Sequence, residues 1–281
     1  MVAAVSVASQ AAAETSEAAR KDLMRGIGRR ADLHALAETT DIDGYAWPAP
    51  GLLAGIPAAI DFANRLLETK RSESKTDPRT FRGADLLAAS RYEDAPAFFD
   101  LALSDEMLQI AADYMGEIPV LAKPRLWWTK PEAYGPGGPQ LFHIGARARP
   151  VVVRQAKFMI AMSDVDENSG PFTFLPLDIS QEIVRAIGYE MGEEVPDEVI
   201  FSYAKPSDVR RFTGKAGASI FVDTSRCFHF GRRQQSKERL MLMIQYKWKQ
   251  DVPITDRVER SPAFYEKYAD DPLRSLIVPV W

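Results

Sequence analysis

The chain has 281 residues, of which 46% are hydrophobic and 26% are charged, and its formal net charge is −4. This composition is typical of a globular protein with one large core. The negative charge argues against a nucleic-acid binder, which needs a basic surface, and no apolar run is long enough to span a bilayer. We therefore expect neither nucleic acid nor a membrane among its partners.

The N-terminal sequence and the cysteine content indicate where the protein works. Residues 1–19 are rich in Ala and Ser but lack the basic start of a secretion signal, so we expect a disordered lead-in. Cys227 is the only cysteine, which excludes an internal disulfide and a cysteine-cluster metal site, and we interpret it as a small core residue. Both observations favour the cytoplasm.

The N-terminal part, residues 1–118, is predicted to be mainly helical. Apolar residues recur at helical spacing over 15–38, 57–70 and 96–115. Within the last of these, Ser104 can cap a second helical segment, because its hydroxyl can accept a backbone N–H at a helix start.

The pattern changes near Pro119, and residues 119–250 are predicted to form a β core. Short strands separated by Gly- and Pro-containing turns are expected at 120–129, 139–145, 151–163, 171–176, 218–223, 226–230 and 238–248, with one helix at 179–191. Many short strands of this kind are typical of a jelly roll or barrel. The Pro-rich tail, 251–281, is expected to be irregular, and the whole chain is predicted to be a single α+β domain.

The chain has three histidines, and two of them lie in the predicted β core. His34 stands in a helix among charged residues, where a surface position is expected. His143 and His229 stand among aromatic and aliphatic neighbours, where an imidazole needs a polar partner. Each alone is compatible with a core histidine bonded to a carbonyl. Two in one small barrel indicate a metal site, because imidazole suits iron, zinc and copper.

Four segments of the C-terminal half, 140–145, 163–172, 217–231 and 239–246, resemble the phytanoyl-CoA dioxygenase-like family of iron(II)/2-oxoglutarate-dependent oxygenases. The resemblance implies a double-stranded β-helix, Fe(II) on His143 and His229, 2-oxoglutarate as cosubstrate, and O2 and a small molecule as partners. It implies that Arg239 pairs with the distal carboxylate of 2-oxoglutarate, which suits its bidentate guanidinium. Gln140 and Gly231 are expected to shape the same pocket.

Position 145 departs from the family pattern, because a Gly stands where a carboxylate ligand is normal. Halogenases of this broad superfamily look similar, with chloride in the vacated position, so Gly145 predicts a halide-binding position and halogenation of an aliphatic C–H bond. Arg147 and Arg149 would then add positive potential. A hydroxylase completed by water or by Asp223, an Asp-to-Gly variant, and an inactive small-molecule-binding protein of the same fold are the alternatives.

The sequence leaves the substrate and the oligomeric state open. Trp127 and Trp128 are adjacent in a predicted strand and should face opposite sides. One can line the cavity while the other packs under the helices, or both can be core aromatic residues. The loop 132–139 is a candidate lid or a plain turn. The long charged segment 192–212 is a candidate for substrate contacts.

Overall fold

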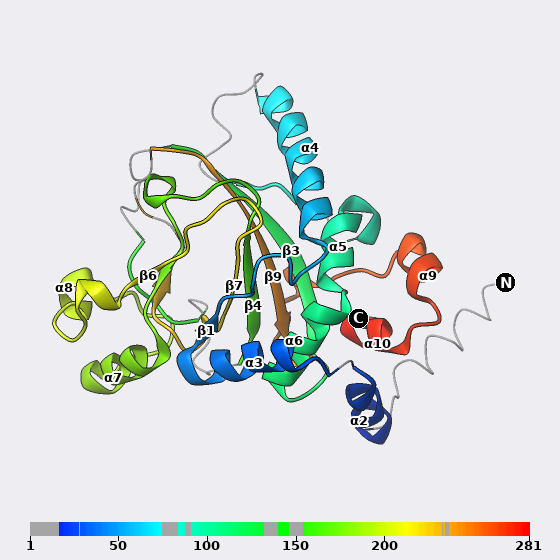
Figure 1. Ribbon diagram of the computed structural model, residues 1–281, viewed down its shortest axis with the longest axis horizontal. Helices are drawn as coiled ribbons and strands as arrows, with labels where there is room; N and C mark the ends of the chain where they lie inside the picture. Colours follow the sequence, from blue (N-terminus) through cyan, green and yellow to red (C-terminus); the bar gives the residue numbers. More distant parts are fainter. Residues whose placement is uncertain are drawn as a thin grey trace.

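The computed structural model describes residues 17–27, 29–74, 84–87, 91–131, 140–145, 154–231, 233 and 236–281. In this part of the chain, helices surround two antiparallel sheets, as the sequence predicts for a mixed helical and β structure. Figure 1 shows one group of helices beside the larger sheet and a second group, α7 and α8, beyond β6 at the other end of the molecule.

The N-terminal part is helical, but two of the predicted helices are divided. The helices are α2 (Glu17–Gly26), α3 (Ala31–Asp43), α4 (Ile56–Ser74), α5 (Pro96–Ala102) and α6 (Asp105–Met115). The division before α6 follows from Ser104, whose hydroxyl accepts the Met107 amide at 3.4 Å and caps the new helix, as predicted.

The larger sheet has six strands in the order β1 (Tyr45–Ala46), β7 (Ser219–Val222), β4 (Ala156–Ala161), β9 (Arg239–Lys247), β3 (Val120–Thr129), β2 (Ala84–Asp85). All neighbours are antiparallel, and β3 pairs with β9 along its length. The register shifts only between Ala122 and Arg125, where Pro124 has no N–H to give to the ladder.

The smaller sheet has the order β6 (Arg210–Arg211), β5 (Thr173–Phe174), β8 (His229–Phe230). A single antiparallel bridge from His143 to His229 extends it beyond β8, and Val195 bridges Phe142 in turn. The strands predicted over 139–145, 171–176 and 226–230 are therefore present only as these short pairings. Along the chain, β3, β4, β7 and β9 join the larger sheet, while His143, β5, β6 and β8 join the smaller one.

Three apolar clusters hold these layers together. The helices cover one face of the larger sheet, α7 (Leu177–Ile187) and α8 (Asp197–Ile200) cover the smaller sheet, and a third cluster fills the space between the sheets. The alternation along β9 assigns its two faces, as the sequence predicts. Leu240, Leu242 and Ile244 pack under the helices, whereas Met241 and Met243 face the space between the sheets.

The C-terminal tail is not irregular, as we expected from its prolines, but contains α9 (Pro262–Tyr268) and α10 (Pro272–Ile277). Each proline is the first helical residue after a cap, Ser261 or Asp271, whose side chain accepts a backbone N–H. Proline is favoured at this position because its missing N–H has no helical partner there. The prolines thus start these helices.

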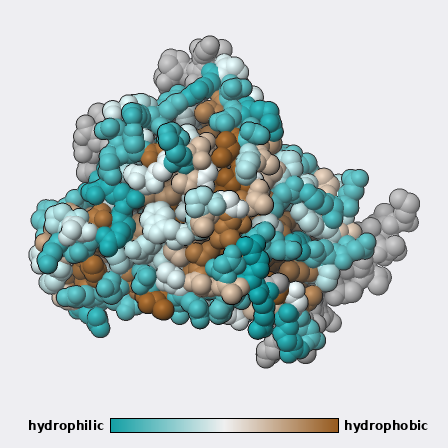
Figure 2. Space-filling model, viewed as in Figure 1, coloured by the Kyte–Doolittle hydropathy of each residue, from teal (hydrophilic) through white to brown (hydrophobic). Residues whose placement is uncertain are grey.

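The molecular surface viewed in Figure 2 is mainly hydrophilic, with hydrophobic residues gathered at its centre over α4 and the region next to it. A groove of about 620 Å³ lies there, lined by Trp47, Pro57 and Ile60 among others. Among the described helices, none combines the length and apolar character that a membrane crossing needs.

Replacing Ser104 by Ala should lower the free energy of unfolding by about 1 kcal/mol, because the first turn of the buried α6 loses its cap. Urea denaturation followed by circular dichroism measures this change. The control is Ser207→Ala, since Ser207 is exposed and caps no helix of this length. Equal stability of the two variants would contradict the assigned cap.

Candidate functional site

His143 and His229 lie side by side in the smaller sheet. The backbone N–H of His143 donates to the carbonyl of His229 at 3.1 Å, and the reverse bond measures 3.0 Å. Residues paired directly across an antiparallel ladder have side chains on the same face. Their ring centroids are accordingly 4.5 Å apart. The structure therefore brings together the two histidines that the sequence singled out.

Each imidazole is oriented by a carbonyl two residues before it. His143 Nδ1 lies 3.1 Å from the Leu141 oxygen, and His229 Nδ1 lies 3.0 Å from the Cys227 oxygen. A carbonyl can only accept, so both Nδ1 atoms carry hydrogen and the lone pair of each neutral ring is on Nε2. A hydrogen bond from the other ring nitrogen to a carbonyl is one that metal-binding histidines commonly make.

The surroundings of His229 keep it neutral. Its side chain is buried, and the Phe172 ring centroid lies 5.7 Å from its own. Burial, and after it the positive form of the neighbouring His143, hold the pKa of His229 well below its usual value. His34, by contrast, is exposed on α3 beside Asp113, which confirms its predicted surface position.

The three residues expected around the distal end of 2-oxoglutarate also meet. Arg239 is buried, its Nη1 donates to the Gly170 carbonyl, and its Nη2 donates to the Gly231 carbonyl at 3.1 Å. The Gly231 N–H donates to Gln140 Oε1 at 2.8 Å. Gln140, Gly231 and Arg239 thus form one chain of hydrogen bonds that fixes the direction of the guanidinium. Because Gly231 follows His229 by two residues, this chain begins next to the histidine pair.

Arg233 is held by several contacts beside the Gln140 segment. Its guanidinium carbon lies 3.9 Å from the Phe230 ring centroid, its Nε donates to the Gln140 carbonyl at 3.0 Å, and its Nη atoms pair with Asp197. Stacking and a bidentate ion pair hold an arginine firmly. Arg233 therefore anchors the segment that carries Gln140. Arg232 lies outside the described residues.

Gly145 has a backbone conformation that favours glycine. Its φ is +73°, and its N–H donates to the Thr224 carbonyl at 2.8 Å. A Cβ added here would meet Met191 Sδ at 3.0 Å. Position 145 is thus a left-handed glycine with sulfur against its missing side chain.

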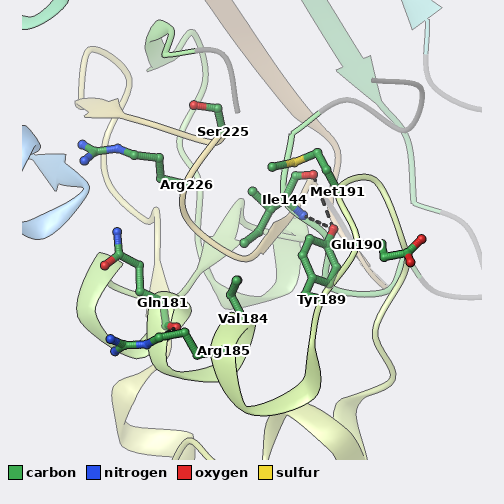
Figure 3. A pocket seen from close by; sticks show the side chains of 9 residues that line it. All are labelled: Ile144, Gln181, Val184, Arg185, Tyr189, Glu190, Met191, Ser225 and Arg226. Atoms are coloured by element: carbon green, nitrogen blue, oxygen red, sulfur yellow. Dashed lines mark hydrogen bonds between the residues drawn. The ribbon is translucent and has the colours of Figure 1, made fainter. Parts of the chain in front are cut away.

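Tyr189 holds the segment before Gly145 from its outer side (Figure 3). Its hydroxyl oxygen accepts the Ile144 N–H at 2.9 Å and the Gly192 N–H at 3.2 Å, and it donates to the Glu193 carbonyl at 2.9 Å. Tyr189, Ile144 and Met191 line a cavity of about 610 Å³. Because successive strand residues face opposite ways, this cavity lies behind the sheet and away from the His143 ring.

Asp223 does not complete the histidine site. Its buried carboxylate accepts bonds from Tyr114 Oη, from the Ser225 N–H at 2.8 Å and from Arg226 Nε at 2.8 Å. It therefore neutralises Arg226 and ties the chain after β7 to α6. Within the described residues, no three His, Cys, Asp or Glu side chains lie together as metal ligands would.

A polar group at the end of β4 escaped the sequence reasoning. Lys157 Nζ donates to Thr224 Oγ1 at 2.7 Å, and Gln155 Nε2 donates to the same oxygen at 2.8 Å. Burial, with the positive charge of Lys247 second, lowers the pKa of Lys157 to about 8. The available signal was the alternation along β4, which places Lys157 on the face of Met159, between the sheets.

Trp127 and Trp128 face opposite sides of β3, as expected. Trp128 packs in the cluster under the helices, whereas Trp127 lies opposite Met241, whose side chain faces the space between the sheets. Cys227 is buried, and burial raises the pKa of its thiol, so it is a protonated core residue as interpreted. The loop 132–139, Arg147 and Arg149 lie outside the described residues.

No family model and no curated protein matches the sequence. Among solved structures, the chain is similar to EctD from S. alaskensis with bound Fe, at 17% identity over 80% of this chain and 78% of that one, with a TM-score of 0.53. It is similar to AviO1 from Streptomyces viridochromogenes Tue57, at 17% identity over 80% of this chain and 99% of that one, with a TM-score of 0.52. It is also similar to EctD from S. alaskensis with 2-oxoglutarate and 5-hydroxyectoine, at 16% identity over 80% of this chain and 86% of that one, with a TM-score of 0.51. At these identities the likeness shows a shared fold.

Replacing Gly145 by Ala should lower the free energy of unfolding by about 1–2 kcal/mol from the left-handed backbone, with a further loss from the Met191 contact. Gly188→Ala is the matched control, because Gly188 also has a positive φ but no atom near its missing Cβ. Urea denaturation of both variants, and of Gly145→Ala with Met191→Ala, separates the two costs. Equal losses at positions 145 and 188 would remove Met191 from the explanation.

Proposed function

We propose that the two sheets form a double-stranded β-helix and that the chain is one domain of this kind. The support is the alternation of chain segments between the sheets, which gives the orders β7-β4-β9-β3 and β6-β5-β8-His143. Two antiparallel sheets with four such segments each, connected in this way, are typical of a jelly roll. The solved structures with the same fold include one with Fe and one with 2-oxoglutarate.

We propose that the protein is an Fe(II)/2-oxoglutarate-dependent oxidoreductase acting on an aliphatic C–H bond of a small molecule. The observation that carries this proposal is the histidine pair, adjacent and on one face, with both Nδ1 atoms on carbonyls. Two neutral imidazoles with Nε2 lone pairs suit iron. When bound, the iron and 2-oxoglutarate would supply the oxidising power for the C–H bond.

The protein residues would bind and orient these groups. His143 and His229 would hold the metal, and the buried Arg239 would pair with the distal carboxylate of 2-oxoglutarate. Gln140 and Gly231 would keep the guanidinium in place through their hydrogen bonds. The apolar side chains between the sheets, such as Met241 and Phe172, would exclude water from the reacting centre.

For the reaction type we propose halogenation, with halide at the position that Gly145 leaves without a carboxylate. The substrate C–H, halide, O2, 2-oxoglutarate and one proton would give the C–halogen product, succinate, CO2 and water. The left-handed backbone of Gly145 and the commitment of Asp223 to Arg226 support a site without an acidic ligand. Hydroxylation, in which water completes the site, is the competing outcome.

The first experiment needs no substrate. Fe(II) and 2-oxoglutarate added to the apoprotein without oxygen should give a visible charge-transfer band, and chloride should shift it. Sulfate at equal ionic strength is the control for a salt effect. A band indifferent to chloride would favour hydroxylation, and a folded protein without a band would contradict the metal site.

Single substitutions assign the residues in the same assay. His143→Ala and His229→Ala should each abolish the band, whereas His34→Ala should keep it, because His34 is exposed on α3. Arg239→Gln should weaken 2-oxoglutarate binding about tenfold or more through loss of a charge-assisted pair. Arg211→Gln is its control, since Arg211 is exposed on β6. Loss of the band in His34→Ala would reject the histidine assignment. A loss of 2-oxoglutarate binding in Arg211→Gln as large as that in Arg239→Gln would reject the arginine assignment.

A further inference from the structure

Lys157 places a positive charge at one end of the space between the sheets. It lies on β4 opposite Gln245 of β9, two positions from Met159 on the same face. Arg239 begins β9 and is six residues from Gln245, which corresponds to about 20 Å along a strand. The space between the sheets therefore has a cation near each end.

Lys157 is a partly buried ammonium without a carboxylate partner among the described residues. Its Nζ donates to the neutral Thr224 hydroxyl at 2.7 Å. The nearby charges are the like charges Lys247 and Arg125 and the carboxylate of Asp223, and Asp223 is already bound to Arg226. A buried charge is costly unless it is paired, so this arrangement favours an anion from outside the chain.

The groups beside Lys157 form a polar wall that connects to the candidate halide position. Gln155 Nε2 donates to Thr224 Oγ1, and Gln245 Nε2 donates to Gln155 Oε1. The carbonyl of the same Thr224 accepts the Gly145 N–H at 2.8 Å. Thr224 therefore connects Lys157 to Gly145. Gly145 and Gly231 follow the two antiparallel histidines at opposite ends, so Lys157 lies on the opposite side of the histidine pair from Arg239.

We propose that Lys157 is a substrate-binding residue and that the substrate is an organic acid whose anionic group pairs with this ammonium. The proposal rests on the proposed function. Two acids would then bind together, 2-oxoglutarate at Arg239 and the substrate at Lys157. The carbon chain between the acid group and the reacting C–H bond would lie along apolar residues such as Met159 and Met243.

The test uses hexanoate as the probe and hexanamide as its neutral match. Calorimetry with the apoprotein, without iron, should show hexanoate binding at least tenfold more tightly than hexanamide. Lys157→Met should remove this preference, Lys157→Arg should keep it, and the exposed-lysine control Lys215→Met should leave it unchanged. Because no iron is present, a failed charge-transfer assay and a failed hexanoate assay are separate results.

Two further measurements decide between this site and its alternatives. Hexanoate should bind equally well with saturating 2-oxoglutarate present, because the two cations are separated by about 20 Å along the strands. The melting temperature of Lys157→Met without ligand should equal or exceed that of the parent, because an uncompensated buried charge is removed. Competition between the two acids, a strongly destabilised Lys157→Met, or binding of chloride but not hexanoate would each overturn the proposal.

Discussion

Two backbone hydrogen bonds between His143 and His229 determine the geometry on which the rest of the site depends. They place both imidazoles on one face of the smaller sheet and within contact of each other. The pairing is short, since β8 has two residues and His143 contributes a single bridge. Its neighbours must therefore hold it. The Leu175 N–H donates to the Phe228 carbonyl, and the Phe228 N–H donates to Ser180 Oγ on α7.

The histidine pair is also connected to the helical layer through a buried carboxylate. Asp223 bonds to Tyr114 on α6 and to Arg226, and Arg226 donates to the Thr40 carbonyl on α3. The intervening segment contains Thr224, whose carbonyl holds Gly145. A carboxylate in an apolar surrounding is stable only with such partners. The position of the sheet face that carries the two histidines therefore depends on helices that lie outside the smaller sheet.

The sequence predicted the long elements well, because they leave local signals, and it singled out two core histidines that the structure brings together. The alternation along β9 and the cap at Ser104 are confirmed, and the two core histidines lie together. The lengths of the short strands were overestimated, because a two-residue pairing such as β5 depends on the neighbouring strands more than on its own residues. The prediction of an irregular C-terminal tail was wrong, because proline breaks a helix in its interior but is favoured at its first residue.

The residues that the sequence did not reveal act through distant contacts. Arg233 stacks on a ring nearby but pairs with Asp197, and Lys157 meets Thr224 across two strands. Both contacts join residues that are far apart in the sequence, so no local sequence pattern predicts them. Asp223 was weighed as a carboxylate that could complete the site, yet its carboxylate is held by Arg226 and by Tyr114, which lies 109 residues away.

The left-handed glycine at position 145 affects how this protein could change its chemistry during evolution. A carboxylate gained there by one codon change would meet the Met191 sulfur and would have to adopt a backbone that most side chains avoid. The first step towards an acidic ligand would thus lower fitness through folding before any new reactivity could be selected. Relaxation of the turn around Met191 would have to come first, so the order of substitutions, as well as their identity, would limit the available paths.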